Sequence, residues 1–588
     1  MLAVPWLLAT GLAIMPYADV HSGQRGVCVT EWSGGEKITI PVEVVGTLPG
    51  SQPGQRAVLV RLDDPRFADA GVVAGMSGSP VYVDGKLLGA VAFGWSFARE
   101  ALAGVTPFED MKAIPSPQPS PQPMGLEWRT GPGWPGNLAA GGLEKPREEN
   151  PLQLLAAAFK GERDLASLLP PAPPSSQELP LAWGGGGNSF WTEKFFRPMG
   201  FMPVPAASQE ASEGEPEAGD MVAAVLVWGD AVLAAGGTLT ARDGSTFYAF
   251  GHPLIAAGPV RIPAARARVL AVQSSFALPF KIFTVGKAFA TFVADQPAGM
   301  IAVAGNPPPG LPVTVTVRSG ESHDRFRFYM ADVPVLKPLL AAFLVATSTS
   351  AREGPNADLT VDLTATARFA DGRELTIRQN TAGPDAVARA ATFTGALVGV
   401  LANPPFEAPE LTALDLTVAR SPHASATILD AIPQRRRVRP GETLPVAVRL
   451  QPFRGPSQTK SYTVTIPRGL GPGKVDLIVA DGASFADYAV RSERWSPADF
   501  PQLLAQLSRL EPSSTLVLAL ETRETGLSLP AGPMPAVPPS VAVSWSKTLS
   551  GNTERLTTNL SVSTRDAFPW PLVGGVRVSV EVLPAEVP

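Results

Sequence analysis

The run from Gly75 to Pro80, Gly-Met-Ser-Gly-Ser-Pro, contains the residues of this sequence that are best suited to chemistry. Glycines on both sides of Ser77 allow the tight turn that presents a serine hydroxyl as a nucleophile. In such a turn the backbone amides of Gly75 and Ser77 can point into one pocket. That pocket would hold the negatively charged oxygen of a tetrahedral acyl-transfer intermediate. We therefore predict Ser77 as nucleophile and Gly75 and Ser77 as oxyanion-hole donors.

A serine hydroxyl needs a base to take its proton, and the sequence has only four histidines. His21 follows an apolar N-terminal segment, His323 lies in a charged stretch, and His423 lies in an apparent interdomain loop. His252 directly follows the apolar strand predicted over 247–251, whose final glycine would present the imidazole at the end of the strand. His252 is the favoured base, and a core or loop histidine bonded to backbone is the alternative.

The third member of such a site would be a carboxylate that fixes the imidazole tautomer and stabilises the imidazolium. Asp63 and Asp64 follow the strand predicted over 57–62 and precede Ser77 by a short loop. An Asp-Asp-Pro run also opens turns, and spacing alone favours that interpretation.

The elements around these residues read mostly as strands. Residues 81–83, an Asp84-Gly85 turn and residues 86–93 predict a hairpin directly after Ser77. Strand patterns also cover 37–46 and return over 221–330. A serine turn that runs into a hairpin is typical of barrel proteases, whereas α/β-hydrolases place the serine between a strand and a helix.

The stretch from Gly35 to Trp95 resembles the SpoIVB peptidase family of serine peptidases. The residues that carry this resemblance are Asp64-Pro65-Arg66, the run from Gly71 to Pro80, and the run from Gly85 to Val91. A second matching stretch joins Gly236–Thr240 to Tyr248–Leu254, and a weaker third one runs from Val285 to Gly305.

The resemblance implies Ser77 as nucleophile, His252 as general base and Asp64 as orienting acid, with Asp63 as the fallback. It also implies peptide-bond hydrolysis through an acyl-enzyme intermediate. In the sporulation enzyme the histidine half comes first, whereas here the serine half does, and no region resembles the family's PDZ domain. We interpret the order as a permutation of one fold, since two half-barrels packed face to face can follow in either order. Paralogues with rearranged order can keep the fold and lose turnover.

The predicted fold class is mostly β: a permuted trypsin-like double β-barrel core, followed by helical elements and C-terminal β-sandwich-like domains. The predicted segments are a signal-like segment (1–20), a serine half-barrel (21–113), a Pro/Gly-rich linker or arm (114–220), a histidine half-barrel (221–332), a mixed α/β extension (333–424), a β-sandwich-like domain (425–495) and a C-terminal helix and β region (496–588).

Composition excludes several classes of function. Of 588 residues, 45% are apolar and 17% charged, which suffices for a large buried core. The net charge of −5 and the lack of a long basic run give no footprint for nucleic acid. Cys28 is the single cysteine, so an internal disulfide and a thiolate metal cage are excluded. We expect no cofactor and no metal.

Residues 2–15 are apolar and uncharged. This segment is shorter than the ~20 residues that span a bilayer, and it resembles the core of a secretory signal without its basic leader. We therefore expect an exported protein, periplasmic, in the cell envelope or extracellular, with no transmembrane span. A buried N-terminal strand is the alternative.

The sequence thus predicts an exported serine endopeptidase that acts on a protein or peptide substrate, with envelope proteins as candidate partners. The alternative is a catalytically inactive cell-envelope binding or structural protein on a protease-like scaffold, which the long remainder 331–588 favours. A third interpretation is an unrelated all-β module in which the serine turn is only a turn. The distance between Ser77 Oγ and His252 Nε2 discriminates, because proton transfer needs these atoms within hydrogen-bonding reach.

Overall fold

The computed structural model contains the whole chain. The residues that the structure describes are 12–49, 55–67, 71–95, 100–115, 151–160, 162, 179–184, 189–206, 214–275, 278–352, 354–493, 497–522, 526–529, 532–534, 537–538, 540–541, 543–544, 554–556 and 558–584. The chain divides into two compact units, one made of 1–123, 169–311 and 327–340 and the other of 124–168, 312–326 and 341–588. As predicted, strands dominate the secondary structure.

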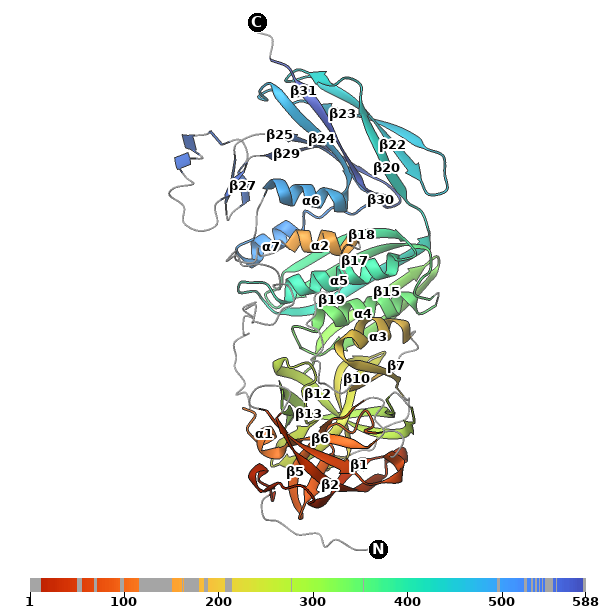
Figure 1. The fold of residues 1–588 in the computed structure, drawn as a ribbon. Helices are drawn as coiled ribbons and strands as arrows, with labels where there is room; N and C mark the ends of the chain where they lie inside the picture. Colours follow the sequence, from red (N-terminus) through yellow and green to blue (C-terminus); the bar gives the residue numbers. More distant parts are fainter. Residues whose placement is uncertain are drawn as a thin grey trace. The chain divides into compact units, whose positions relative to one another are not determined.

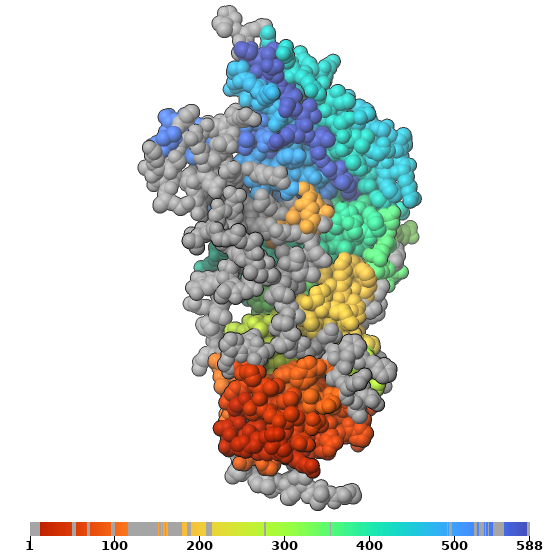
Figure 2. Space-filling model, in the orientation of Figure 1, coloured from red at the N-terminus to blue at the C-terminus, as the bar shows by residue number. Residues whose placement is uncertain are grey.

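The first unit begins with a closed six-stranded barrel. Its strands are β1 (Arg25–Glu31), β2 (Lys37–Pro49), β3 (Arg56–Leu62), β4 (Pro80–Val83), β5 (Lys86–Phe93) and β6 (Leu102–Pro107), hydrogen-bonded in the order β1-β2-β3-β6-β5-β4. Alternating valine, isoleucine and leucine side chains fill its core. The chain segments that form this barrel make up the red-to-orange block in Figure 2. The predicted hairpin after Ser77 is confirmed as β4 and β5, with Asp84 and Gly85 both at positive φ as a two-residue turn requires.

A second ring of strands follows in the same unit. It consists of β9 (Met221–Gly229), β10 (Val232–Asp243), β11 (Thr246–Ala249), β12 (Gly258–Gln273), β13 (Phe280–Gln296) and β14 (Gly299–Ala304). They are hydrogen-bonded in the order β9-β12-β13-β14-β11-β10, and β9 also pairs with β10, so the ring closes. In Figure 1 these yellow-green strands lie beside the red and orange strands of the first barrel.

The ring of β9–β14 is a second barrel, and backbone hydrogen bonds on either side of the serine turn join it to the first barrel. Thr238 N donates to Ser77 O at 2.7 Å, and Ala74 N donates to Pro279 O at 2.8 Å. Gly78 lies so close to the second barrel that a Cβ on it would stand 2.0 Å from Thr238 O. Only glycine fits this approach, and only glycine readily adopts the φ of +98° and +95° at Gly75 and Gly78.

In the described part of the chain, the first unit also contains short helices and flanking strands. They include α1 (Phe108–Lys112), α3 (Ser189–Phe196), β7 (Leu179–Gly184), β8 (Phe201–Pro205) and the 3-10 helices Tyr17–Asp19, Ser33–Gly35, Pro65–Phe67 and Arg197–Met199. Strand β7 pairs with β10, and β8 pairs with β7. The range 114–220, predicted as a linker or arm, therefore contains two strands that extend the second barrel's sheet.

The chain passes between the units within β15 (Leu311–Ser319), β16 (Ser322–Met330) and α4 (Lys337–Ser350). The second unit also contains α2 (Pro151–Lys160), β17 (Leu359–Phe369), β18 (Glu374–Gly383), α5 (Ala386–Ala402) and β19 (Leu411–Pro422). Strands β18, β17, β19 and β15 are neighbours in that order, and α5 packs against β17 and β18. Helices α4 and α5 lie within the range 333–424, which the sequence predicts as a mixed α/β extension.

Two further sheets share one apolar core in the second unit. One has the order β23-β22-β20-β30 and the other β21-β31-β24-β25-β29. Their elements are β20 (Ala426–Pro433), β21 (Arg437–Val438), β22 (Thr443–Pro452), β23 (Gln458–Thr465), β24 (Gly473–Asp481), β25 (Thr515–Thr522), β29 (Asn559–Ala567), β30 (Leu572–Val573) and β31 (Gly575–Val582). Helices α6 (Gly482–Glu493) and α7 (Phe500–Leu507) and the small sheet of β26 (Gly526–Leu529), β27 (Gly532–Met534) and β28 (Glu554–Leu556) complete the unit.

The end of the apolar N-terminal segment packs against the first barrel. Ile14 forms a parallel bridge with Leu87, and Met15, which is 4% exposed, donates its amide to Leu87 O at 2.9 Å. Residues 1–11 of the predicted signal-like segment lie outside the described residues. In the described part of the chain, no helix combines the length and apolar character that crossing a bilayer requires.

Replacing Gly78 with alanine tests the close approach of the two barrels. In G78A the new methyl group meets the Thr238 carbonyl, so we expect roughly 1–3 kcal/mol of overpacking cost beyond the strain of a positive φ. The matched control is G85A, which has the same kind of φ but no atom within 4 Å of its Cβ position. Denaturant unfolding of both variants measures the difference, and equal losses of stability would contradict the contact.

Candidate active site

The serine turn connects β3 to β4, after the 3-10 helix of residues 65–67, and its backbone is arranged around Ser77. The amides of Met76, Gly78 and Ser79 donate to Val73, Val91 and Met76 carbonyls, respectively. Among the described residues, by contrast, the amides of Gly75 and Ser77 donate to no partner. Free amides at these two positions are what an oxyanion hole needs.

His252 lies in the loop after β11, in a short stretch of unusual backbone. Phe250 and Gly251, the two residues before it, have φ of +69° and +66°. A positive φ is costly for a phenylalanine, and such strain is found where surrounding contacts fix a functional side chain. Thr106 of β6 donates its hydroxyl to Gly251 O at 2.7 Å. A Cβ on Gly251 would lie 2.9 Å from Ala90 Cβ, so the loop rests directly on β5 of the first barrel.

The structure brings Ser77 and His252 together. Ser77 Oγ lies 2.9 Å from His252 Nε2, although the two residues are 175 positions apart in the chain. His252 Nδ1 lies 2.7 Å from Pro253 O. Because a carbonyl oxygen only accepts, Nδ1 carries the proton and donates to it, and neutral Nε2 accepts from the Ser77 hydroxyl. This is the tautomer that a general base requires.

Burial decides the charge of His252. Ser77 is 1% exposed and His252 7% exposed. Removal from water disfavours the imidazolium and lowers the pKa of His252 to about 4, and the hydrogen bond to Pro253 O opposes this only in part. The imidazole is therefore neutral and able to accept a proton at neutral pH.

The structure does not bring Asp64 to His252. Both carboxylate oxygens of Asp64 are bonded to Arg66, with Oδ1 2.9 Å from Nε and Oδ2 2.6 Å from Nη2. The bond from Arg66 lowers the pKa of Asp64. Asp63 is exposed, and its amide donates to Pro41 O. Arg66 lies only two residues after Asp64 in the chain. Its guanidinium therefore reaches the Asp64 carboxylate at the turn and binds it in place of the histidine.

Asp295 is a buried carboxylate that sequence reasoning did not single out. It accepts the amides of Leu254 at 2.7 Å and of Ile255 and Ala257 at 3.0 Å each. These bonds tie the loop after His252 to the end of β13. Burial raises the pKa of Asp295, and the backbone amides oppose that rise. Its one signal in the sequence was its position inside the weaker third stretch of family resemblance.

A second contact between histidine and serine occurs in the other unit. His423 Nε2 lies 2.9 Å from Ser425 Oγ, its Nδ1 lies 2.6 Å from Asp358 Oδ1, and its ring stacks on Phe453. The amides on either side of Ser425 are both used: Ala424 donates to Thr360 Oγ1 and Ala426 to Pro571 O. These bonds hold the segment between β19 and β20 in place, and we interpret the contact of His423 with Ser425 as structural.

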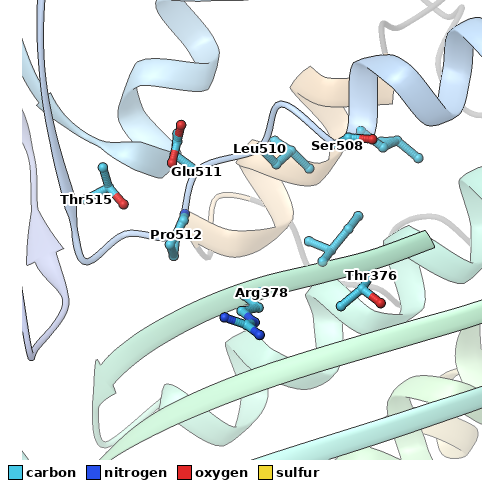
Figure 3. A pocket seen from close by; sticks show the side chains of 9 residues that line it. Thr376, Arg378, Ser508, Leu510, Glu511, Pro512 and Thr515 are labelled. Carbon is cyan, nitrogen blue, oxygen red and sulfur yellow. The ribbon is translucent and has the colours of Figure 1, made fainter. Parts of the chain in front are cut away.

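Figure 3 shows a cavity of about 440 Å³ in the second unit. It lies between β18 and the segment after α7, and it is lined by Thr376, Ile377, Arg378, Leu507, Ser508, Leu510, Glu511, Pro512 and Thr515. Its lining contains no histidine or cysteine beside a hydroxyl, so it lacks a nucleophile with a base. No group of three or more His, Cys, Asp or Glu side chains in the described residues is placed to hold a metal ion.

Known proteins resemble the part of the chain that contains the serine turn. Residues 8–106 match the family model of SpoIVB peptidase S55. The family predicted from the sequence is thereby confirmed over this range, which includes Asp64 and Ser77 and ends before His252. No curated protein and no solved structure matches the chain significantly. The S55 match therefore rests on the first barrel, and the contribution of the second barrel is seen in the hydrogen bond from Ser77 to His252.

Replacing Asp295 tests whether it holds the histidine loop. In D295A one buried and two part-buried amides lose their acceptor, so we expect a loss of roughly 3 kcal/mol in unfolding free energy. The matched control in the same unit is D243A, which removes an exposed ion pair with Lys112 and should cost less than about 1 kcal/mol. Thermal unfolding compares the two, and a D295A protein as stable as D243A would rule out the anchoring role.

Proposed function

We propose that this protein is a serine peptidase whose Ser77 attacks a peptide carbonyl of a protein substrate. The observation that carries the proposal is the 2.9 Å contact between Ser77 Oγ and His252 Nε2 in a chain whose first barrel matches an S55 peptidase family. A distance of this size supports turnover over the inactive-scaffold alternative, because proton transfer requires direct hydrogen-bonding reach. The closed strand rings and the position of the pair between them also favour a permuted trypsin-like double barrel.

The proposed reaction has two halves. His252 Nε2 takes the Ser77 proton while Oγ bonds to the substrate carbonyl carbon, and the carbonyl oxygen becomes an oxyanion that the Gly75 and Ser77 amides stabilise. The imidazolium then protonates the leaving amine, and the C–N bond breaks to leave an acyl-enzyme. Water repeats the sequence with His252 as base and releases the acid and free Ser77. Pro253 O holds the Nδ1 proton throughout.

The deciding experiment is labelling with a fluorophosphonate, in which Oγ bonds to phosphorus and fluoride leaves. Labelling of the folded protein should map to Ser77, should vanish in S77A, and should slow about 100-fold or more in H252Q because the base is lost. H423Q is the matched control, since it removes the other histidine that contacts a serine, and it should label like the wild type. Absence of label, or label on Ser425, would refute the proposed site.

Asp64 is the predicted orienting acid, and its replacement tests that role separately. Because His252 Nδ1 donates to Pro253 O and Asp64 is held by Arg66, we expect D64N to retain labelling within about tenfold of wild type. A loss as large as that of H252Q would instead show that Asp64 moves to the imidazole during the reaction. Circular dichroism of D64N controls for folding.

Export is a separate proposal that rests on the apolar segment 2–15. The bond from Met15 N to Leu87 O supports the alternative of an N-terminal strand. Fractionation of cells that express the chain with a C-terminal tag decides, because an exported protein leaves the cytoplasmic fraction. We propose envelope proteins as further partners. The C-terminal sheets, arranged like a sandwich, would supply the surface that binds them.

A further inference from the structure

A buried lysine lies directly behind the serine turn and takes no part in the reaction described above. Lys281, the second residue of β13, is 0% exposed. Its amide donates to Ala74 O at 3.1 Å, so its backbone belongs to the contact that joins the second barrel to the turn. Burying an ammonium costs free energy unless it is paired and hydrogen-bonded, so a lysine here needs a reason.

The Lys281 side chain reaches the turn by two routes. Its stem packs against Gly75, where an added Cβ would lie 3.1 Å from Lys281 Cδ. Its Nζ donates to Thr30 Oγ1 of β1 at 2.8 Å. Ser79, two residues after the nucleophile, donates its hydroxyl to the same Thr30 oxygen at 2.8 Å. The ammonium, Thr30 and Ser79 therefore form one buried hydrogen-bonded group attached to the turn.

The same group continues to the carbonyl of Gly75. Thr238 Oγ1 lies 3.4 Å from Ser79 Oγ and donates to Gly75 O at 2.9 Å. Thr240 Oγ1 donates to Gly78 O at 2.8 Å. Threonines of β10 therefore hold two carbonyls of the turn, one on each side of Ser77. The peptide groups that contain the Gly75 and Ser77 amides are held by Lys281 and Ser79, because Lys281 N donates to Ala74 O at 3.1 Å and Ser79 N donates to Met76 O at 2.8 Å. Lys281 and its partner Ser79 thus fix the direction of the amides on which the proposed oxyanion hole depends.

Two titratable groups face the Lys281 ammonium, both from β1. The Glu31 carboxylate accepts the amides of Val269 at 2.7 Å and Met221 at 2.9 Å, and its charge stabilises the ammonium. Cys28 is buried, and burial raises the pKa of its thiol to about 12, so it stays neutral. Removal of the ammonium from water outweighs the stabilisation by these groups of β1 and lowers the pKa of Lys281 to about 8.

We propose that Lys281 is a positioning residue for the proposed peptidase site: through Thr30 and Ser79 it holds the Ser77 turn in its reactive geometry, and its positive charge favours the oxyanion that forms beside Gly75. This inference rests on the proposed function. A fixed positive charge in a water-excluded region stabilises developing negative charge more strongly than it would in water. Lys281 acts only while it is protonated.

The test measures fluorophosphonate labelling kinetics as a function of pH in the full chain. In wild type the rate should fall as pH rises through about 8, because Lys281 loses its charge. K281M keeps the length of the stem but not the charge, so its limiting rate should fall about tenfold or more, with little change in probe affinity, and the alkaline fall should disappear. The matched control is T284V, on the same strand, whose buried hydroxyl has no hydrogen-bond partner among the described residues and should behave like wild type.

The possible outcomes separate the two proposals. A wild-type protein that does not label refutes the proposed function. A wild type that labels, beside a folded K281M that labels as fast and keeps the alkaline fall, overturns the role of Lys281 alone. If K281M does not fold, T30V decides: loss of the acceptor for Nζ should move the alkaline fall to lower pH, because the buried ammonium is less stabilised. An unmoved profile in T30V would also overturn the proposal.

Discussion

The contact of two backbones at the serine turn is the constraint on which the site depends. Thr238 N donates to the carbonyl of Ser77 itself, and Gly78 approaches the second barrel too closely for any side chain. The turn that carries Ser77 is therefore shaped by both barrels. The same contact brings the loop of His252 onto β5, where Gly251 leaves no room for a larger residue.

Burial then determines the chemistry that this geometry can support. Exclusion of water keeps His252 neutral, and the hydrogen bond to the Pro253 carbonyl selects the tautomer whose Nε2 carries no proton. The cost of burying polar groups is offset by bonds to backbone: Asp295 accepts three amides and Glu31 accepts two. Asp295 fixes the loop after His252, whereas Glu31 joins β1 to β9 and β12, so each buried carboxylate has a structural role in an otherwise apolar interior.

Sequence reasoning found what local patterns can reveal. The Gly-Met-Ser-Gly-Ser-Pro run and the Asp-Gly turn encode their own backbone shape, so Ser77 and the β4–β5 hairpin were predictable. His252 was predictable because four histidines left few choices. Asp64 illustrates the limit of such predictions. Its spacing from Ser77 made it a candidate partner of His252, but only the folded structure shows that its carboxylate binds Arg66 instead. Lys281 had no signal of its own and Asp295 had only its place in the third stretch of resemblance, since their partners are amides and hydroxyls far away in the chain.

The distance of 175 residues between nucleophile and base has a consequence for how the chain is made. During synthesis the first barrel emerges with Ser77 before any residue of the second barrel exists. The imidazole then needs β13, which supplies both Lys281 and Asp295, before its loop has an anchor. A ribosome-bound chain shorter than about half the full length therefore carries a serine with no base. On the proposed function, the order of the barrels delays assembly of the serine–histidine pair until the second barrel has been synthesised.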